Sequence, residues 1–274
     1  MIIDGHQHFW DYDPQRDLWI TDEMKVIQKD FRPQDLEVIL KRNNISGSVA
    51  VQAGQTEEET LFLLSCAKGF DFIKGVVGWV DLKNSALEQR LLSFSQYKKL
   101  KGFRHIVQAE QEGFLSDPSF VGGVQLLGKY NFTYDLLVYH YQLKEAFHFV
   151  KSVREVKIVI DHLAKPSIRN GERSPWKADL RALSAYENVY CKLSGMVTEA
   201  LWNNWRIEDF TPYLDDLFEI FGTERVIYGS DWPVCLLAAS YEEQLNIVLD
   251  YIHAFSEREK LNILGKNAER FYNL

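Results

Sequence analysis

The stretch Val156-Lys-Ile-Val-Ile-Asp-His-Leu-Ala-Lys-Pro166 contains the pattern from which the fold can be deduced. Its first five residues form a nearly continuous apolar run, which is typical of a parallel strand buried on both faces. Asp161 and His162 follow at the point where this strand would end. The sequence therefore predicts a buried parallel strand that carries polar side chains at its carboxyl end.

Seven further β-branched or aromatic runs are spread along the chain and are separated by amphipathic stretches. Together with Val156–Ile160 they are Met1–Gly5, Gly47–Val51, Phe72–Val80, Lys101–Val107, Phe132–Val138, Val189–Leu193 and Val226–Gly229. Eight strands in 274 residues leave about 34 residues per unit, which suffices for a strand, a helix and two loops. Eight such alternations predict an α/β fold of the (β/α)8 TIM-barrel type, with a doubly wound parallel sheet as the alternative.

Composition and charge narrow the class of protein. The chain is 46% hydrophobic and 26% charged, which excludes a disordered or fibrous protein. No linker or shift in composition interrupts the chain, so we expect one domain over residues 1–274. We expect the protein to be a monomer or a homodimer. The net charge of −8 and the lack of a long apolar run predict no nucleic-acid or membrane partner. Cys66, Cys191 and Cys235 lie far apart, which favours reduced thiols and a cytoplasmic location.

Polar residues stand at most of the predicted strand ends, where (β/α)8 barrels carry their active sites. They are His6, His8, Gln52, Arg104, His105, Asp135, Asp161, His162, Lys192, Ser194 and Asp231. His6 and His8 are two residues apart on one strand, so both imidazoles can face the same ion or substrate. The first and last strands are neighbours in a closed barrel, which would place Asp231 beside both histidines.

Two long excursions follow predicted strands and are candidate lids over the barrel mouth: Phe9–Pro33 and Met196–Trp205. Five tryptophans lie in these loops or at strand ends, namely Trp10, Trp79, Trp202, Trp205 and Trp232. Aromatic faces can stack on the C–H surface of a sugar ring, so this set favours a polyhydroxylated substrate. Core packing explains any single tryptophan about as well.

Six segments of the sequence resemble the amidohydrolase superfamily, and within it the amidohydrolase-2 branch that contains sugar lactonases and dicarboxylate lactonases. They are DGHQHFW (4–10), GFRH (102–105), DHLAKP (161–166), CKLSG (191–195), YGSDWP (228–233) and LGKNAERFYNL (264–274). The resemblance runs from Met1 to Leu274. It implies a distorted (β/α)8 barrel that hydrolyses an ester-like ring bond.

The resemblance also implies a metal site, from which this sequence departs. Members that bind metal use the histidines of the first strand and the aspartate of the last. Here a single Zn²⁺ could be held by His6, His8, Asp231 and His162. Asp135 stands where many metal-binding members have a histidine, and Arg104 and His105 replace a carboxylated lysine or a glutamate. We therefore expect either one divalent metal ion or none, and no two-metal site.

Hydrolysis of a lactone needs an activated water, a stabilised oxyanion and a protonated leaving group. Asp231 is the predicted general base, because an aspartate with an ordinary pKa of about 3.9 is ionised at neutral pH. His6, His8 and His162 would polarise the carbonyl, directly or through a metal ion. Substrate contacts are predicted for Arg104, His105, Lys192, Gln52, Trp10 and Trp232. Arg104 and Lys192 could instead form structural ion pairs.

The predicted activity is opening of a sugar lactone, an aldonolactone such as L-fuconolactone or L-rhamnonolactone. One alternative is a Zn-dependent amidohydrolase or decarboxylase on the same barrel. Another is a non-catalytic protein that binds a sugar acid. Retention of the histidines together with Asp231 argues against the last, because binding alone needs no base beside a carbonyl.

Overall fold

A computed structural model describes all residues from 1 to 274 and contains one sheet of eight parallel strands, ordered β1 to β8. The strands are β1 (Ile3–Gln7), β2 (Gly47–Val51), β3 (Ile73–Gly78), β4 (Leu100–His105), β5 (Thr133–Leu136), β6 (Ile158–Ile160), β7 (Val189–Leu193) and β8 (Val226–Tyr228). The two edges meet where the His8 amide donates to the Trp232 carbonyl at 2.7 Å and the Asp231 amide donates to the His6 carbonyl at 2.8 Å. The sheet is thus a nearly closed barrel, and the predicted (β/α)8 fold is confirmed.

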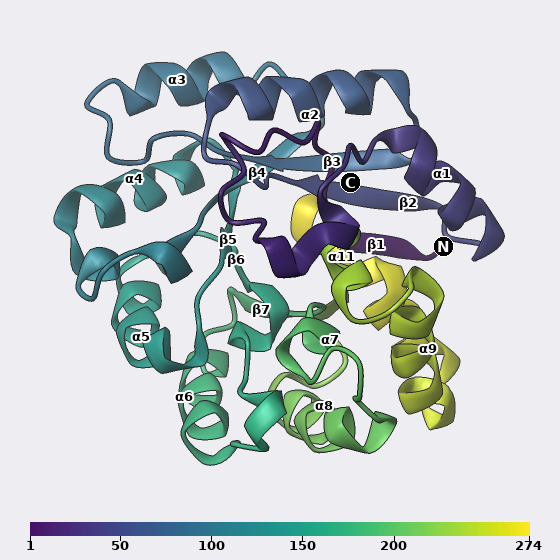
Figure 1. Cartoon of the computed structure of the whole chain (residues 1–274). Helices are drawn as coiled ribbons and strands as arrows, with labels where there is room; N and C mark the ends of the chain where they lie inside the picture. Colours follow the sequence, from purple (N-terminus) through teal and green to yellow (C-terminus); the bar gives the residue numbers. More distant parts are fainter.

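Helices surround the strands (Figure 1). They are α1 (Pro33–Arg42), α2 (Glu57–Gly69), α3 (Leu87–Phe94), α4 (Pro118–Lys129), α5 (Leu143–Ser152), α6 (Ser174–Ser184), α7 (Met196–Glu199), α8 (Ile207–Phe221), α9 (Tyr241–Tyr251), α10 (Glu257–Leu261) and α11 (Asn267–Tyr272). Leu36 and Leu40, one turn apart on α1, show how each helix buries an apolar stripe against the strands. No helix is long and apolar enough to cross a membrane.

Short helical turns occupy many of the connections. They are η1 (Asp22–Ile27), η2 (Val107–Ala109), η3 (Phe114–Ser116), η4 (His140–Gln142), η5 (Asp161–Ala164), η6 (Ile168–Asn170), η7 (Val234–Leu237), η8 (Ile252–Ala254) and the π-type turn η9 (Asn262–Lys266). Several of these turns follow strands directly, so they fix the residues at the strands' carboxyl ends.

The C-terminal helix α11 closes the amino end of the barrel. Phe271 and Tyr272 pack on an apolar layer of inward-facing strand residues that includes Ile3 and Val159. Lys101, near the start of β4, donates to the Asn273 carbonyl at 2.7 Å. In Figure 1 this helix lies inside the ring formed by the other helices. Helix α11 therefore fills the amino end of the barrel. An open site can lie only at the carboxyl end.

Candidate active site

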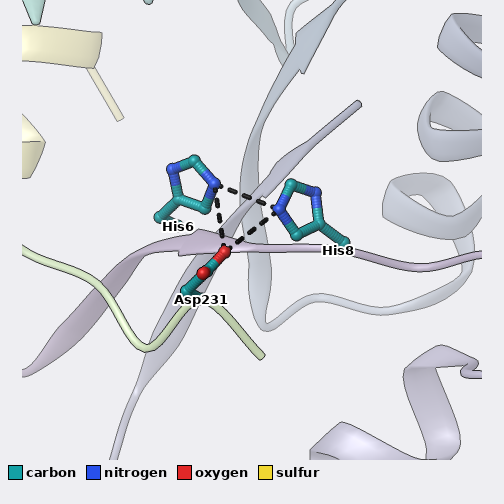
Figure 2. A group of neighbouring side chains, drawn as sticks. All are labelled: His6, His8 and Asp231. Carbon is teal, nitrogen blue, oxygen red and sulfur yellow. Dashed lines mark hydrogen bonds and ion pairs between the residues drawn. The ribbon is translucent and has the colours of Figure 1, made fainter. Parts of the chain in front are cut away.

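Four of the predicted site residues meet at the carboxyl end of the barrel: His6, His8, His162 and Asp231. Figure 2 shows three of them, with His6 Nε2 3.1 Å from His8 Nε2. The Asp231 Oδ1 atom lies 3.7 Å from His6 Nε2, 3.4 Å from His8 Nε2 and 3.8 Å from His162 Nε2. All four side chains are buried. The spacing of HxH on β1 and the adjacency of β1 and β8 produce this centre, as predicted.

The backbone fixes the orientation of the second β1 histidine. His8 Nδ1 lies 2.7 Å from the Val51 carbonyl oxygen on β2. Because a carbonyl only accepts, His8 carries its proton on Nδ1 and turns the lone pair of Nε2 toward the centre. His162 is held in a similar way, with Nδ1 2.8 Å from the Ser194 hydroxyl at the end of β7.

Two of the four residues adopt a left-handed backbone that the sequence did not signal. Asp231 has φ of 58°, and His162 begins a run of four such residues that ends at Lys165, with φ between 48° and 56°. Each left-handed residue other than glycine costs about 1–2 kcal/mol. The run is held by Trp176, whose indole donates to the Leu163 carbonyl at 2.7 Å. Strain of this kind is typical of residues kept in place for function.

Gly195 provides a direct test of how tightly His162 is positioned. Its φ is 64°, and a Cβ atom there would lie 2.6 Å from His162 Nδ1. We expect Gly195→Ala to displace the imidazole and lower kcat/KM by about 100-fold, the usual effect of a shift of about 1 Å. Gly171→Ala is the matched control, because Gly171 also has a positive φ, 68°, but open space around it. Equal activity losses in both variants would contradict this role of Gly195.

Charged residues form a second layer beneath the centre. Lys192 Nζ lies 2.5 Å from Asp135 Oδ2, 3.0 Å from Asp161 Oδ1 and 3.0 Å from His6 Nδ1. Arg104 Nη1 lies 3.0 Å from Asp161 Oδ2 and 3.3 Å from His6 Nε2. Lys192 and Arg104 are both buried. The structure therefore places these two predicted substrate contacts behind the histidines, paired with carboxylates.

Gln52 belongs to the same layer. Its side-chain amide donates to the Arg104 carbonyl at 3.1 Å, and the Arg104 guanidinium donates to both the backbone and the side-chain oxygen of Gln52. Gln52 thus orients Arg104. Asp161 and Asp135 are the partners that a buried lysine requires, so Arg104 and Lys192 form the structural ion pairs that were the alternative to substrate contacts.

Electrostatics leave the centre with one carboxylate among neutral imidazoles. Burial alone would raise the pKa of Asp231, but the neighbouring His162, His8 and His6 hold it below its usual range. Burial lowers the pKa of His162 to about 4. Burial and the adjacent Lys192 lower the pKa of His6 well below its usual value. At neutral pH the site therefore contains an ionised aspartate and uncharged histidines.

The structure does not bring His105 to this centre. Successive residues on a strand point to opposite faces, so when Arg104 faces the barrel interior, His105 faces the helices. His105 Nε2 donates to the Glu110 carboxylate at 2.8 Å, and its ring stacks on Phe114 with 4.8 Å between centroids. The prediction had not taken this alternation into account.

The predicted lid Phe9–Pro33 is anchored beside the centre by aromatic residues. Trp10 and Phe31 pair through two backbone hydrogen bonds of 3.0 and 2.9 Å, and the Trp10 indole donates to the Lys29 carbonyl. Trp232 packs edge-on against Phe31. Both tryptophans are buried, so the structure gives them packing contacts, although the Trp10 ring lies 6.4 Å from that of His8.

A cavity of about 400 Å³ opens among the loops that follow β5, β6 and β7. Its lining includes Tyr139, His140, Tyr141, Arg169, Glu199 and Trp202. His140 is half-buried, with Nδ1 2.8 Å from the Lys165 carbonyl. Burial raises the pKa of Glu199, although Lys165, 3.9 Å away, opposes this shift, and the charge of Asp231 adds to it. Glu199 was not among the predicted site residues.

The donor atoms of the centre also fit a single metal ion. Ligands at about 2.0–2.1 Å around a tetrahedral Zn²⁺ lie about 3.4 Å from one another. The donor atoms of His6, His8 and Asp231 lie 3.1 Å, 3.4 Å and 3.7 Å from one another, and these separations bracket that value. His6, His8 and Asp231 form one group that could hold a metal ion.

The chain is similar to known proteins over nearly its whole length. Residues 3–274 match the Amidohydrolase family. The L-fucono-1,5-lactonase of Burkholderia multivorans (strain ATCC 17616 / 249) is 38% identical over 284 residues, 99% of this chain and 96% of that protein. The L-fucono-1,5-lactonase of Burkholderia ambifaria (strain ATCC BAA-244 / DSM 16087 / CCUG 44356 / LMG 19182 / AMMD) is 34% identical over 99% of this chain and 95% of that protein.

A crystal structure of an amidohydrolase from Burkholderia multivorans with bound Zn superposes with a TM-score of 0.97 at 37% identity, covering 100% of this chain and 99% of that one. The family match and these full-length similarities support the resemblance noted in the sequence. The chain belongs to the amidohydrolase family.

Proposed function

We propose that this enzyme opens the ring of a sugar lactone, with L-fucono-1,5-lactone as the first substrate to test. The observation that carries the proposal is the buried Asp231 carboxylate, whose Oδ1 lies within 3.8 Å of three histidines at the carboxyl end of the barrel. Two lactonases at 38% and 34% identity over nearly the whole chain support the same reaction.

In the proposed mechanism, Asp231 binds a water molecule and takes a proton from it as the oxygen attacks the lactone carbonyl. The oxyanion that forms is stabilised by the imidazole N–H groups that face the centre. The tetrahedral intermediate then collapses with cleavage of the bond to the ring oxygen. Asp231 returns its proton to that oxygen, which leaves a hydroxyl group and a sugar acid.

A metal ion at the centre would be held by His8, Asp231, His162 and His6, and it would supply Lewis-acid polarisation of the carbonyl. The bound Zn in the crystal structure of the Burkholderia relative supports this option. The protein's own contribution is the same in either case: Asp231 and the histidines are held by their backbone contacts within reach of one carbonyl group.

The surroundings favour a hydroxylated substrate over a dicarboxylate. Arg104 is the cation best suited to a carboxylate, but it is buried and already paired with Asp161. The cavity at the mouth offers tyrosine hydroxyls, the Glu199 carboxylate and the ring of Trp202, which suit the hydroxyl groups and C–H face of a sugar. We further propose a cytoplasmic enzyme that acts as a monomer or homodimer.

The test is an assay of sugar 1,4- and 1,5-lactones by pH indicator, with and without chelator, on one purified sample. We expect turnover of L-fucono-1,5-lactone well above spontaneous hydrolysis. Turnover that survives chelation would support direct polarisation by the histidines, whereas loss with recovery on adding Zn²⁺ would make them ligands. No turnover across the panel would contradict the proposed substrate class.

A further inference from the structure

The buried ammonium group of Lys192 makes two hydrogen bonds, to Asp135 Oδ2 at 2.5 Å and to His6 Nδ1 at 3.0 Å. Asp161 Oδ1 lies 3.0 Å away and forms an ion pair with the ammonium group without a hydrogen bond. An ammonium group has no lone pair, so it can only donate. His6 Nδ1 must therefore be the acceptor in this contact and cannot itself carry a proton.

We propose that Lys192 holds His6 as the tautomer that carries its proton on Nε2, and so makes His6 a hydrogen-bond donor to the centre. An imidazole with an unprotonated Nδ1 has its proton on Nε2. The neighbouring histidine fits this assignment, because His8 donates from Nδ1 to the Val51 carbonyl and so presents a bare Nε2. That nitrogen lies 3.1 Å from His6 Nε2, which is the distance of a hydrogen bond from His6 to His8.

The opposite tautomer fits the same contacts less well. With the proton on Nδ1, His6 would point an N–H at an N–H of Lys192, and one ammonium hydrogen would lose its acceptor. The bare Nε2 atoms of His6 and His8 would then face each other at 3.1 Å. Arg104 Nη1 could donate to His6 Nε2 in the opposite tautomer, but that contact, at 3.3 Å, is longer than the 3.0 Å contact between Lys192 Nζ and His6 Nδ1.

In this assignment His6 and His8 have different protonation at Nε2, and this difference affects metal binding. His8 offers a lone pair to the centre as it stands, whereas His6 offers an N–H. For His6 to ligate a metal ion through Nε2, its proton has to move to Nδ1, where the acceptor is Asp161 Oδ1 at 3.4 Å. The hydrogen bond from Lys192 to His6 opposes that move. Lys192 is thus a positioning residue that favours the metal-free state of His6, whatever substrate the centre takes.

The tautomer of His6 can be determined directly by spectroscopy of the wild-type protein. Metal-free enzyme labelled with ¹⁵N-histidine would be examined by long-range ¹H–¹⁵N spectroscopy, which distinguishes protonated from bare ring nitrogens. The His6→Gln variant assigns the His6 signals among the seven histidines. We expect a bare Nδ1 and a protonated Nε2. A protonated Nδ1 in the metal-free enzyme would overturn the proposal, and this measurement needs no folded variant of Lys192.

A second experiment measures Zn²⁺ affinity by competition with a chromophoric chelator, without reference to activity. Lys192→Met is combined with Asp135→Asn, so that the buried layer loses one positive and one negative charge together. The new amide oxygen can still accept from Tyr272, whose hydroxyl lies 2.7 Å from Asp135 Oδ2. Outer-layer partners of metal ligands typically change metal affinity by about 10–100-fold. We expect the double variant to bind Zn²⁺ at least about 10-fold more tightly and to show His6 with a protonated Nδ1 before metal is added.

Lys165→Met combined with Glu199→Gln is the matched control, because it too removes one positive and one negative charge together. Lys165 stands at the same end of the barrel, 3.9 Å from Glu199, and has no contact with His6. We expect this control to leave the His6 tautomer unchanged and to alter Zn²⁺ affinity much less than the Lys192 double variant. Equal affinity changes in the two proteins would show that the effect does not depend on the contact of Lys192 with His6 and would overturn the proposal.

Discussion

Asp231→Asn is expected to lower kcat for sugar-lactone hydrolysis by about 10³-fold, while KM changes by less than a factor of about three. General-base catalysis by a positioned side chain contributes about 10²–10⁴-fold, and an amide cannot take the proton of water. Asparagine has the same shape as aspartate and tolerates the left-handed backbone found here, φ 58°, so the local fold should be kept.

The measurement is a steady-state assay of purified wild type and variant, with thermal unfolding to confirm that both are folded. Asp22→Asn is the control, because Asp22 is exposed on η1 and lies outside the described centre. It should keep wild-type kinetics. Retention of more than about a tenth of wild-type kcat by Asp231→Asn would show that another group acts as the base.

Asp161→Asn is expected to give the largest loss of stability, about 3–5 kcal/mol in the free energy of unfolding at pH 7. Asp161 pairs with Arg104 and Lys192, and removing its charge leaves both buried cations with too little compensation. Burial alone would raise its pKa, but Lys192, His6 and Arg104 hold that pKa well below the usual range. Its stabilising effect is therefore complete above pH about 4 and is lost as the pH falls below that value.

Asp135→Asn is the matched comparison, because Asp135 shares the same ammonium group. Burial, together with the charge of Asp161, raises the pKa of Asp135 to about 6, although Lys192 opposes the shift. The fold thus favours the neutral acid, and the stability that this contributes at low pH is lost as the pH rises through about 6. We expect a much smaller loss than for Asp161→Asn, and one that decreases between pH 5 and pH 8. Urea unfolding at pH 5 and at pH 8 measures the loss of stability. Equal losses for Asp135→Asn and Asp161→Asn would contradict this assignment of charge.

Most of the fold was predictable because the barrel repeats one simple pattern. Each strand is a short apolar run with a polar residue at its carboxyl end, and Val156–His162 shows both features within seven residues. The core of the site followed from two facts of strand geometry. His6 and His8 share a face because they are two apart, and Asp231 joins them because the barrel brings its first and last strands together.

The residues that were misplaced or missed depend on interactions that no local pattern encodes. His105 was predicted at the site, but Arg104 takes the inward position and turns it toward the helices. The pairing of Lys192 with Asp161 joins two strands through side chains, which becomes visible only when their register is known. The left-handed run from His162 to Lys165 has no glycine, so the usual sequence signal for such a backbone is missing.

The most direct test of the central claim is hydrolysis of L-fucono-1,5-lactone in H₂¹⁸O, followed by mass spectrometry of the product as a function of enzyme concentration. We expect rapid ring opening at a rate proportional to the concentration of wild-type enzyme, with one ¹⁸O atom in the carboxylate of the acid. We also expect Asp231→Asn to add almost nothing to the spontaneous rate. A rate that is independent of enzyme, or equal for wild type and Asp231→Asn, would contradict the proposed function.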